Sequence, residues 1–340
     1  MRPIHEILNN QYYKKSTWIL IFLPLSFIYF AIISFRSWAY KAGIFKSIKM
    51  DVPVIVIGNI TIGGTGKTPL AIWLLEAFLK IGMKPGLICS GYNSNAKCPQ
   101  KVSIDSEVLD VGDEALMIKL RFRKLHNINI PIFVGKKKAL VGKALLKAYP
   151  DTNILISDDG LQHYELKRDF EIVVVDGDRK FGNGFLLPGG PLRERVAKIN
   201  EVDALVLNGF TKNWKDEKIP LTYRMSCYSG MVVNCHDSNS VSDLDDLKKE
   251  IVAITGIGNP ERFFKQLNAS GLKFKKVIFN DHHIFTESDF KDYDHMDIIM
   301  TEKDAVKCKN FLQENLWYMP IFADVNEKLF KELIKKIRIN

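Results

Sequence analysis

The sequence predicts an α/β protein: a parallel sheet with helices on both faces, a smaller α/β second domain and an N-terminal membrane-associated helix. Three observations lead to this prediction. Short apolar runs alternate with helical patterns along most of the chain, a glycine-rich loop follows the first of these runs, and a charge-free stretch lies near the N-terminus. Continuous apolar strands separated by helices are typical of a parallel sheet that is covered on both faces.

The charge-free stretch covers residues 16–35. A run of about 20 apolar residues is long enough to span a bilayer. However, basic residues flank both of its ends, whereas a spanning helix normally has them mainly on one side, and Pro24 would kink a helix over this run. We therefore expect an element that lies in the membrane interface, with a spanning helix as the first alternative and a buried core helix as the second. No cleavage site of small residues is present, which argues against a secretory signal.

Composition restricts which binding partners and which cellular compartment are expected. The formal charge of +9, from 48 basic and 39 acidic residues, favours a polyanionic neighbour such as anionic lipid, nucleotide or nucleic acid. No helix-turn-helix, zinc or RNP-like signature accompanies this charge, so we expect no nucleic acid partner. The five cysteines form no CxxC pair, which argues against a disulfide framework or a zinc ribbon and indicates a reducing cytoplasm.

The elements divide the chain into two α/β regions. In the first, strands are expected at residues 53–58, 86–89, 132–134, 153–156, 171–175 and 204–207, and helices at 67–80, 114–124 and 136–149. In the second, strands are expected at 251–255, 276–279, 297–300 and 316–321, and helices at 260–270 and 327–337. Polar, turn-rich sequence separates the two sets. We therefore expect a membrane-associated segment (1–50), a main α/β domain (51–225), a linker (226–248) and a smaller α/β domain (249–340).

The glycine-rich loop after the first strand carries the strongest chemical signal. Residues 61–68 read TIGGTGKT, which differs from the P-loop pattern GxxxxGK[ST] only at Thr61, where the pattern has a glycine. In such a loop the backbone N–H groups surround phosphates, Lys67 reaches the β- and γ-phosphates, and the Thr68 hydroxyl ligates Mg²⁺. A glycine turn that merely starts a helix is the alternative, but the order of strand, loop and helix favours a P-loop NTPase-like site. The expected nucleotide-binding residues are Thr61, Ile62, Gly63, Gly64, Thr65, Gly66, Lys67 and Thr68.

Two adjacent carboxylates end another apolar strand. Residues 153–159 read NILISDD, as a Walker B strand does. Hard oxygen ligands at the end of a strand beside a P-loop suit Mg²⁺. A pair of aspartates alone marks a turn more often than a metal site. Together with the P-loop, the pattern predicts that Asp158 and Asp159 bind the metal.

Three further segments carry candidate functional side chains. Asp113 stands where a helix starts, and its position alone favours a capping role. His282 belongs to the tripeptide DHH at residues 281–283, which is a short motif, and single histidines are more often structural. The loop 182–194, GNGFLLPGGPLRE, is long and ends in charged residues that include Glu194, which indicates a functional loop rather than a tight turn.

Together these motifs resemble one family, the tetraacyldisaccharide 4′-kinases (lipid A 4′-kinases). The resemblance runs over most of the chain, in ordered blocks at residues 22–26, 58–69, 112–114, 158–164, 181–184, 191–194, 256–260, 281–283 and 300–307. A threonine at the first P-loop position also suits this family. One departure is that the family commonly has SRGYG where this chain has CSGYN at residues 89–93. Ser90 therefore replaces an arginine, and any phosphate contact by that arginine is missing or supplied elsewhere.

The resemblance implies a monotopic enzyme on the cytoplasmic face of the inner membrane of Gram-negative bacteria. It would transfer the γ-phosphate of ATP to the 4′-hydroxyl of a tetraacylated glucosamine disaccharide 1-phosphate, a late step of lipid A assembly. The family's catalytic aspartate falls on Asp113 and its helping histidine on His282. Its nucleotide and Mg²⁺ positions fall on Lys67, Thr68, Asp158 and Asp159, with Glu194 near the metal.

In this reading Asp113 would accept the proton of the sugar hydroxyl and His282 would hold or tune that carboxylate. Because the two residues fall in different expected domains, domain closure would bring them together.

Two other classes of protein remain open. A membrane-bound P-loop switch ATPase often carries an extra lysine at the position of Ile62, which this chain lacks. A membrane-anchored binding protein would use ATP only structurally.

Overall fold

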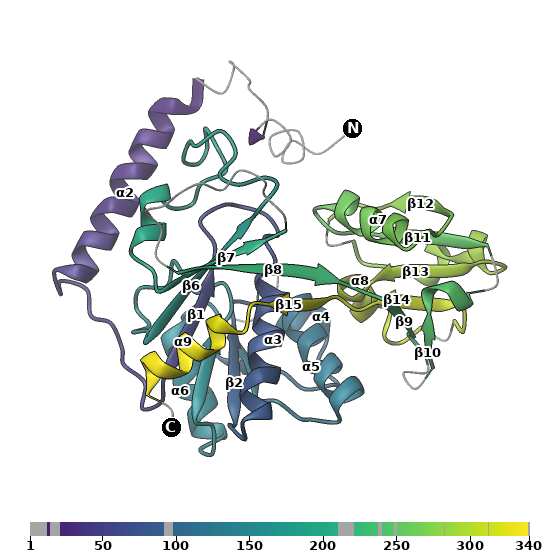
Figure 1. The fold of residues 1–340 in the computed structure, drawn as a ribbon, viewed down its shortest axis with the longest axis horizontal. Coiled ribbons are helices and arrows are strands. Elements are labelled where there is room, and N and C mark those ends of the chain that lie inside the picture. Colours follow the sequence, from purple (N-terminus) through teal and green to yellow (C-terminus); the bar gives the residue numbers. More distant parts are fainter. Residues whose placement is uncertain are drawn as a thin grey trace. The chain divides into compact units, whose positions relative to one another are not determined.

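A computed structural model describes residues 12–13, 21–91, 98–209, 221–236, 240–247, 250–281, 283–311 and 313–338 (Figure 1). The contacts divide the chain into two compact units. Unit 1 comprises residues 1–90, 137–226 and 325–340, and unit 2 comprises residues 91–136 and 227–324. This division differs from the expected one, because the segment that holds Asp113 belongs to unit 2. The expectation placed Asp113 in the main domain and His282 in the smaller one, whereas residues 91–136 and 227–324 fall in one unit here.

Unit 1 is built on a parallel sheet in the order β8–β7–β6–β1–β5–β2. Its strands are β1 (Val54–Gly58), β2 (Pro85–Cys89), β5 (Ile154–Ser157), β6 (Phe170–Asp176), β7 (Ala204–Asn208) and β8 (Thr222–Tyr228). Its helices include α2 (Leu23–Lys41), α3 (Lys67–Lys80), α6 (Lys138–Ala148), η2 (Val196–Asn200) and α9 (Lys328–Ile337), the last reached through β15 (Phe322–Val325). The predicted α/β class with a large parallel sheet is confirmed.

The central strands of unit 1 are buried because apolar side chains point to both of their faces. Every residue of β1, β2 and β5 is buried, which matches the continuous apolar runs seen in the sequence. Helix α3 packs its apolar side chains, including Leu70, Leu74 and Phe78, into the same core. Full burial of each such side chain contributes roughly 1.5–3 kcal/mol. This core therefore holds α3 against the sheet, next to the end of β1.

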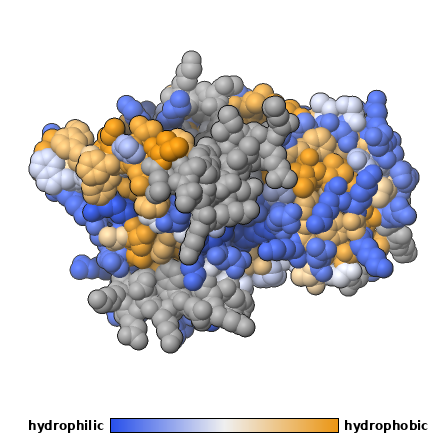
Figure 2. Space-filling view, turned by 90° about the horizontal axis from the view of Figure 1, so that it is seen from above, coloured by the Kyte–Doolittle hydropathy of each residue, from blue (hydrophilic) through white to orange (hydrophobic). Residues whose placement is uncertain are grey.

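Helix α2 has two different faces. On one face Ser26 Oγ donates to the carbonyl of Leu186 and accepts from the N–H of Gly189, both at 2.9 Å, and the Tyr29 hydroxyl donates to the carbonyl of Arg193 at 3.0 Å. The other face exposes Leu25, Phe27, Ile28, Ile32, Phe35 and Trp38. Figure 2 shows this apolar group at its left side, where α2 lies in Figure 1.

The predicted kink at Pro24 is not found, because Pro24 lies in the first turn of α2, where its missing N–H is not needed. Residues 16–20, the beginning of the charge-free stretch, lie outside the described residues. Among the helices of the described residues, none combines the length and the apolar character that crossing a membrane requires.

Unit 2 holds a six-stranded mixed sheet in the order β10–β9–β14–β13–β11–β12. Its strands are β9 (Met231–Asn234), β10 (Val241–Asp243), β11 (Ile251–Thr255), β12 (Phe274–Ile278), β13 (Asp297–Thr301) and β14 (Leu316–Met319). Outside this sheet, β3 (Gln100–Lys101) pairs with β4 (Ile132–Val134) in antiparallel fashion. Its helices are α4 (Val108–Val111), α5 (Asp113–His126), α7 (Pro260–Ala269), α8 (Glu302–Ala305), η3 (Leu244–Asp246), η4 (Glu287–Asp289), η5 (Lys291–Tyr293) and η6 (Val306–Cys308).

The stretch expected as a linker, residues 226–248, instead contributes β9 and β10 to this sheet. The strand β9 pairs with β14 and β10 in antiparallel fashion. Val232 and Val233 are fully buried. The polar residues around this short apolar core hid it in the sequence.

Candidate active site

The P-loop leaves the C-terminal end of β1, between β5 and β6, and ends where α3 begins at Lys67. Gly66 has φ of +99°, and a Cβ at this position would collide with the side-chain nitrogen of Asn208. Both the backbone conformation and the close approach therefore require glycine. The strand–loop–helix order that the sequence predicted is present.

Two asparagines that the sequence analysis did not single out hold the loop. Asn208, the last residue of β7, donates from Nδ2 to the carbonyl of Thr65 at 2.8 Å. Asn59, directly after β1, donates from Nδ2 to the carbonyl of Thr61 at 2.7 Å. Both are buried. The sequence could have indicated both asparagines, because each stands at the end of an apolar strand of a parallel sheet, where ligand-binding side chains gather.

Lys67 and Asp159 face each other across the site. Lys67 Nζ lies 3.5 Å from Asp159 Oδ1, and Arg193 Nη2 lies 2.8 Å from the same oxygen. Arg193 Nη1 approaches Asp159 Oδ2 at 3.3 Å, so the arginine pairs with both carboxylate oxygens. Burial by itself raises the pKa of Asp159, but the charges of Lys67 and Arg193 outweigh burial and hold this pKa well below its ordinary range. Asp159 is therefore a carboxylate at any pH near neutrality.

Asp158 and Thr68 form the second part of the site. The Thr68 hydroxyl lies 3.5 Å from Asp158 Oδ2, and Asp158 is buried. Lys138, which is fully buried, donates to the carbonyls of Asp158 at 2.6 Å and of Ile88 at 3.1 Å. Lys138 thereby fixes the backbone of the aspartate pair to the end of β2. A hydroxyl and a carboxylate at this spacing fit Mg²⁺, which in P-loop proteins takes its other ligands from phosphates and water.

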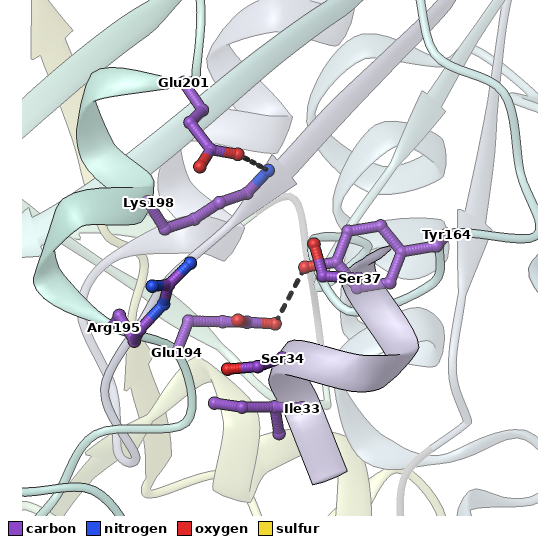
Figure 3. A pocket seen from close by; sticks show the side chains of 8 residues that line it. All are labelled: Ile33, Ser34, Ser37, Tyr164, Glu194, Arg195, Lys198 and Glu201. Atoms are coloured by element: carbon purple, nitrogen blue, oxygen red, sulfur yellow. Dashed lines mark hydrogen bonds and ion pairs between the residues drawn. The ribbon is translucent and has the colours of Figure 1, made fainter. Parts of the chain in front are cut away.

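Glu194 has other surroundings. Its carboxylate accepts from the Tyr164 hydroxyl at 3.1 Å and lines a pocket against α2 (Figure 3), whose lining also includes Ser34, Arg195 and Lys198. Burial raises the pKa of Glu194. Within the described residues, no group of three or more histidine, cysteine, aspartate or glutamate side chains could hold a metal ion. The assignment of Glu194 as a residue near the metal stays a prediction.

Asp113 is the first residue of α5, in unit 2. Its position differs from the expected cap, because the N-cap residue is Gly112. Asp113 Oδ1 accepts from the N–H of Glu114 at 2.9 Å, and Asp113 Oδ2 lies 3.6 Å from Lys303 Nζ. The carboxylate thus satisfies one of the N–H groups of the first turn. It also belongs to an ion pair that local sequence does not reveal.

Lys303 links Asp113 to the DHH tripeptide. Lys303 Nζ lies 3.4 Å from Glu114 Oε1. Burial by itself lowers the pKa of Lys303, but the carboxylates of Glu114, Asp113 and Asp281 outweigh burial and raise this pKa above its ordinary value. The neighbouring His283 pairs through Nε2 with Asp289 at 3.1 Å. His282 lies outside the described residues, so its role stays a prediction.

The block at residues 300–307 has a structural role in placing Lys303. Arg121 of α5 forms a buried two-point ion pair with Glu302, with Nε to Oε1 at 2.7 Å. Asp304 is fully buried and accepts from the hydroxyls of Thr255 at 2.9 Å and Thr301 at 2.7 Å. These bonds fix α8 between β11 and α5. Because α8 is held on both sides, Lys303 is presented to the first turn of α5.

A central strand that runs into a P-loop, with an aspartate pair at the end of the adjacent strand, defines unit 1 as the nucleotide-binding part of a P-loop enzyme. A family model described as tetraacyldisaccharide-1-P 4′-kinase matches residues 18–338. The chain belongs to the tetraacyldisaccharide 4′-kinase family of lipid A biosynthesis, and it is an ATP-dependent kinase. The family resemblance found in the sequence is thereby confirmed.

Individual relatives agree with this assignment. The tetraacyldisaccharide 4′-kinase of Methylobacillus flagellatus is 41% identical over 333 residues, covering 97% of this chain and 95% of the relative. That of Pasteurella multocida is 39% identical over 332 residues, covering 96% and 97%. The crystal structure of LpxK from Aquifex aeolicus in complex with ATP has a TM-score of 0.77 and 27% identity, covering 94% of this chain and 99% of that chain.

Proposed function

We propose that the protein transfers the γ-phosphate of ATP to the 4′-hydroxyl of a tetraacylated glucosamine disaccharide 1-phosphate, at the cytoplasmic face of the inner membrane. The observation that carries this proposal is the P-loop lysine Lys67, which faces Asp159 at 3.5 Å beside the Thr68–Asp158 pair. The similar structure from Aquifex aeolicus was solved with ATP. Family membership supports the lipid acceptor.

Phosphoryl transfer depends on positioning and on charge stabilisation. The N–H groups of the P-loop and Lys67 bind the phosphates of ATP. The 4′-hydroxyl oxygen attacks the γ-phosphorus, its proton passes to Asp113, and the bond to the β-phosphate oxygen breaks to release ADP. Thr68 and Asp158 would hold Mg²⁺, with Asp159 beside them. The ion, when bound, neutralises charge on the phosphates.

The exposed face of α2 supports action at a membrane surface. Ile28, Ile32 and Phe35 expose 56%, 59% and 59% of their surface, whereas the basic side chains of Arg36 and Lys41 on the same helix bind the Gln162 carbonyl and Glu201. A helix with one exposed apolar face can lie in the membrane interface with those apolar side chains in lipid. The net charge of +9 suits an anionic surface.

The direct test of the proposed reaction is transfer of label from γ-labelled ATP into the purified disaccharide acceptor, with the labelled position determined on the product. We expect label at the 4′ position, and ATP consumption that rises only when the acceptor is present. Lys67→Ala should remove most of this transfer, because its amine is the P-loop cation for the β- and γ-phosphates. ATP hydrolysis that is independent of the acceptor, with no labelled lipid, would instead favour a switch ATPase.

The membrane part of the proposal is tested by sedimentation with vesicles of anionic phospholipid. Replacing Ile32 and Phe35 together by glutamate should weaken vesicle binding at least about tenfold. Burial of roughly half of each side chain in lipid contributes about 1 kcal/mol, so the two together contribute about 2 kcal/mol. Ile81→Glu, which changes a 49% exposed residue just after α3, is the matched control and should bind normally. Unchanged binding of the double variant would assign the membrane contact to another part of the chain.

A further inference from the structure

Arg179 lies in the turn after β6, and Asp176 holds its side chain in one direction. The N–H groups of Asp178 and Arg179 donate to Asp176 Oδ1, each at 3.0 Å, as in an Asx-turn. The other oxygen, Oδ2, accepts from Arg179 Nε at 3.1 Å and lies 3.0 Å from Nη2. Because the carboxylate meets the edge of the guanidinium, β6 fixes the position of this cation.

From this turn the guanidinium of Arg179 reaches the P-loop. Its Nη2 donates to the carbonyl of Gly64, and its Nη1 lies 3.0 Å from the place that a Cβ on Gly63 would occupy. Gly63 has φ of +91°, so conformation and space both require glycine there. The ring of Tyr13 lies 5.6 Å from the guanidinium carbon. The cation is therefore placed against the residues whose N–H groups surround phosphates in a P-loop.

One nitrogen of this guanidinium can still take an acceptor. Within the part of the chain that the structure describes, Nε and Nη2 have acceptors, whereas Nη1 has none. Arginine carries five N–H donors, so Nη1 can donate to a phosphate oxygen without losing the contacts to Asp176 and Gly64. Holding the loop does not by itself require Arg179, because Asn59 and Asn208 already bind its carbonyls.

We infer that Arg179 is a further catalytic residue, whose Nη1 donates to the terminal phosphate of ATP and stabilises the negative charge of the phosphoryl group during transfer. This inference rests on the proposed function and assigns one more cation to the same reaction, in addition to Lys67. Arginines that enter the phosphate site of P-loop enzymes, from the same chain or from a partner, contribute about 10³–10⁵ in kcat.

The test compares Arg179→Ala and Arg179→Lys with the wild-type enzyme in transfer from ATP to the disaccharide acceptor, alongside binding of ATP and ADP and thermal denaturation. We expect Arg179→Ala to lose at least about a hundredfold in kcat, with a smaller change in ATP affinity and a normal Tm. Arg179→Lys should recover little, because an ammonium group lacks the planar fork that Asp176 orients. Added guanidinium at millimolar concentration should partly restore Arg179→Ala and leave Lys67→Ala inactive.

Lys84→Ala is the matched control, since Lys84 is an exposed cation of unit 1 that pairs with Asp151 at 3.0 Å. It should behave as the wild type. A kcat of Arg179→Ala within about threefold of wild type would overturn the inference. So would an equal loss of ATP and ADP binding that guanidinium does not restore, because that pattern indicates a merely structural role. If wild type and Lys67→Ala alike transfer no phosphate to the lipid, the proposed function itself fails.

Discussion

Replacing Asp113 by asparagine separates the two roles open to this residue. The structure places Asp113 at the first position of α5, where Oδ1 accepts from the Glu114 N–H and Oδ2 lies 3.6 Å from Lys303 Nζ. Asparagine keeps a side-chain oxygen for the N–H group. However, it cannot accept a proton at neutral pH, so it removes the proposed base while the helix start is retained.

The structure allows the effects of Asp113→Asn on kcat and on stability to be estimated. Loss of a general base lowers kcat by about 10²–10⁴, which corresponds to roughly 2.7–5.4 kcal/mol at 1.36 kcal/mol per tenfold change. The loss of stability should be near 1 kcal/mol, because the lost ion pair is long and Lys303 is 25% exposed. Lys303 also keeps Glu114 at 3.4 Å and Asp281 as partners. The catalytic effect should therefore greatly exceed the effect on folding.

The assay measures kcat for transfer to the disaccharide acceptor, ATP affinity and Tm on the same preparations. Glu114→Gln is the matched control, because it removes a neighbouring carboxylate from the same lysine without removing the proposed base. We expect Asp113→Asn to bind ATP normally and lose at least about a hundredfold in kcat, while Glu114→Gln stays within about threefold. Equal activity of the two variants would refute the assignment of Asp113 as the base.

Three further predictions concern the metal site and the packing around Asp113. Thr68→Ala should raise the Mg²⁺ concentration needed for half-maximal activity, so that excess Mg²⁺ partly restores the rate, because one of two paired oxygens is removed. Glu194→Gln should leave that Mg²⁺ requirement unchanged, since Glu194 bonds to Tyr164; a raised requirement would return Glu194 to the metal. Arg121→Met should lower the free energy of unfolding, measured in denaturant, by about 3–5 kcal/mol, because it leaves Glu302 buried and unpaired. Adding Glu302→Gln to this variant should recover part of the lost stability.

The strands that form the centre of the fold were predictable because they are apolar without interruption. β1, β5 and β6 were expected within one or two residues of their observed bounds. β9 was not expected, since two buried valines inside a polar stretch give no periodic pattern. The grouping of α5 with unit 2 was also not predictable. It rests on long-range contacts such as the pair Arg121–Glu302, whose members lie 181 residues apart.

The site shows the same limit at the level of single side chains. The P-loop and the aspartate pair are local motifs, so their residues could be named from the sequence. Arg193 and Glu194 are adjacent in the sequence, yet their side chains have different partners. Arg193 turns toward Asp159, and Glu194 turns toward Tyr164. The sequence alone could not tell which of the two faces the aspartates.

The cluster around Lys303 explains how Asp113 can act as a base in the proposed reaction. A base must be ionised before it accepts a proton, and the Lys303 cation lies 3.6 Å from Asp113 Oδ2. A cation that depended on this one carboxylate would also oppose protonation, since it would lose its partner. Lys303 instead shares its charge with Glu114 and Asp281. When Asp113 takes the proton of the acceptor hydroxyl, Lys303 therefore remains paired with Glu114 and Asp281. Asp281 is the first residue of the DHH tripeptide.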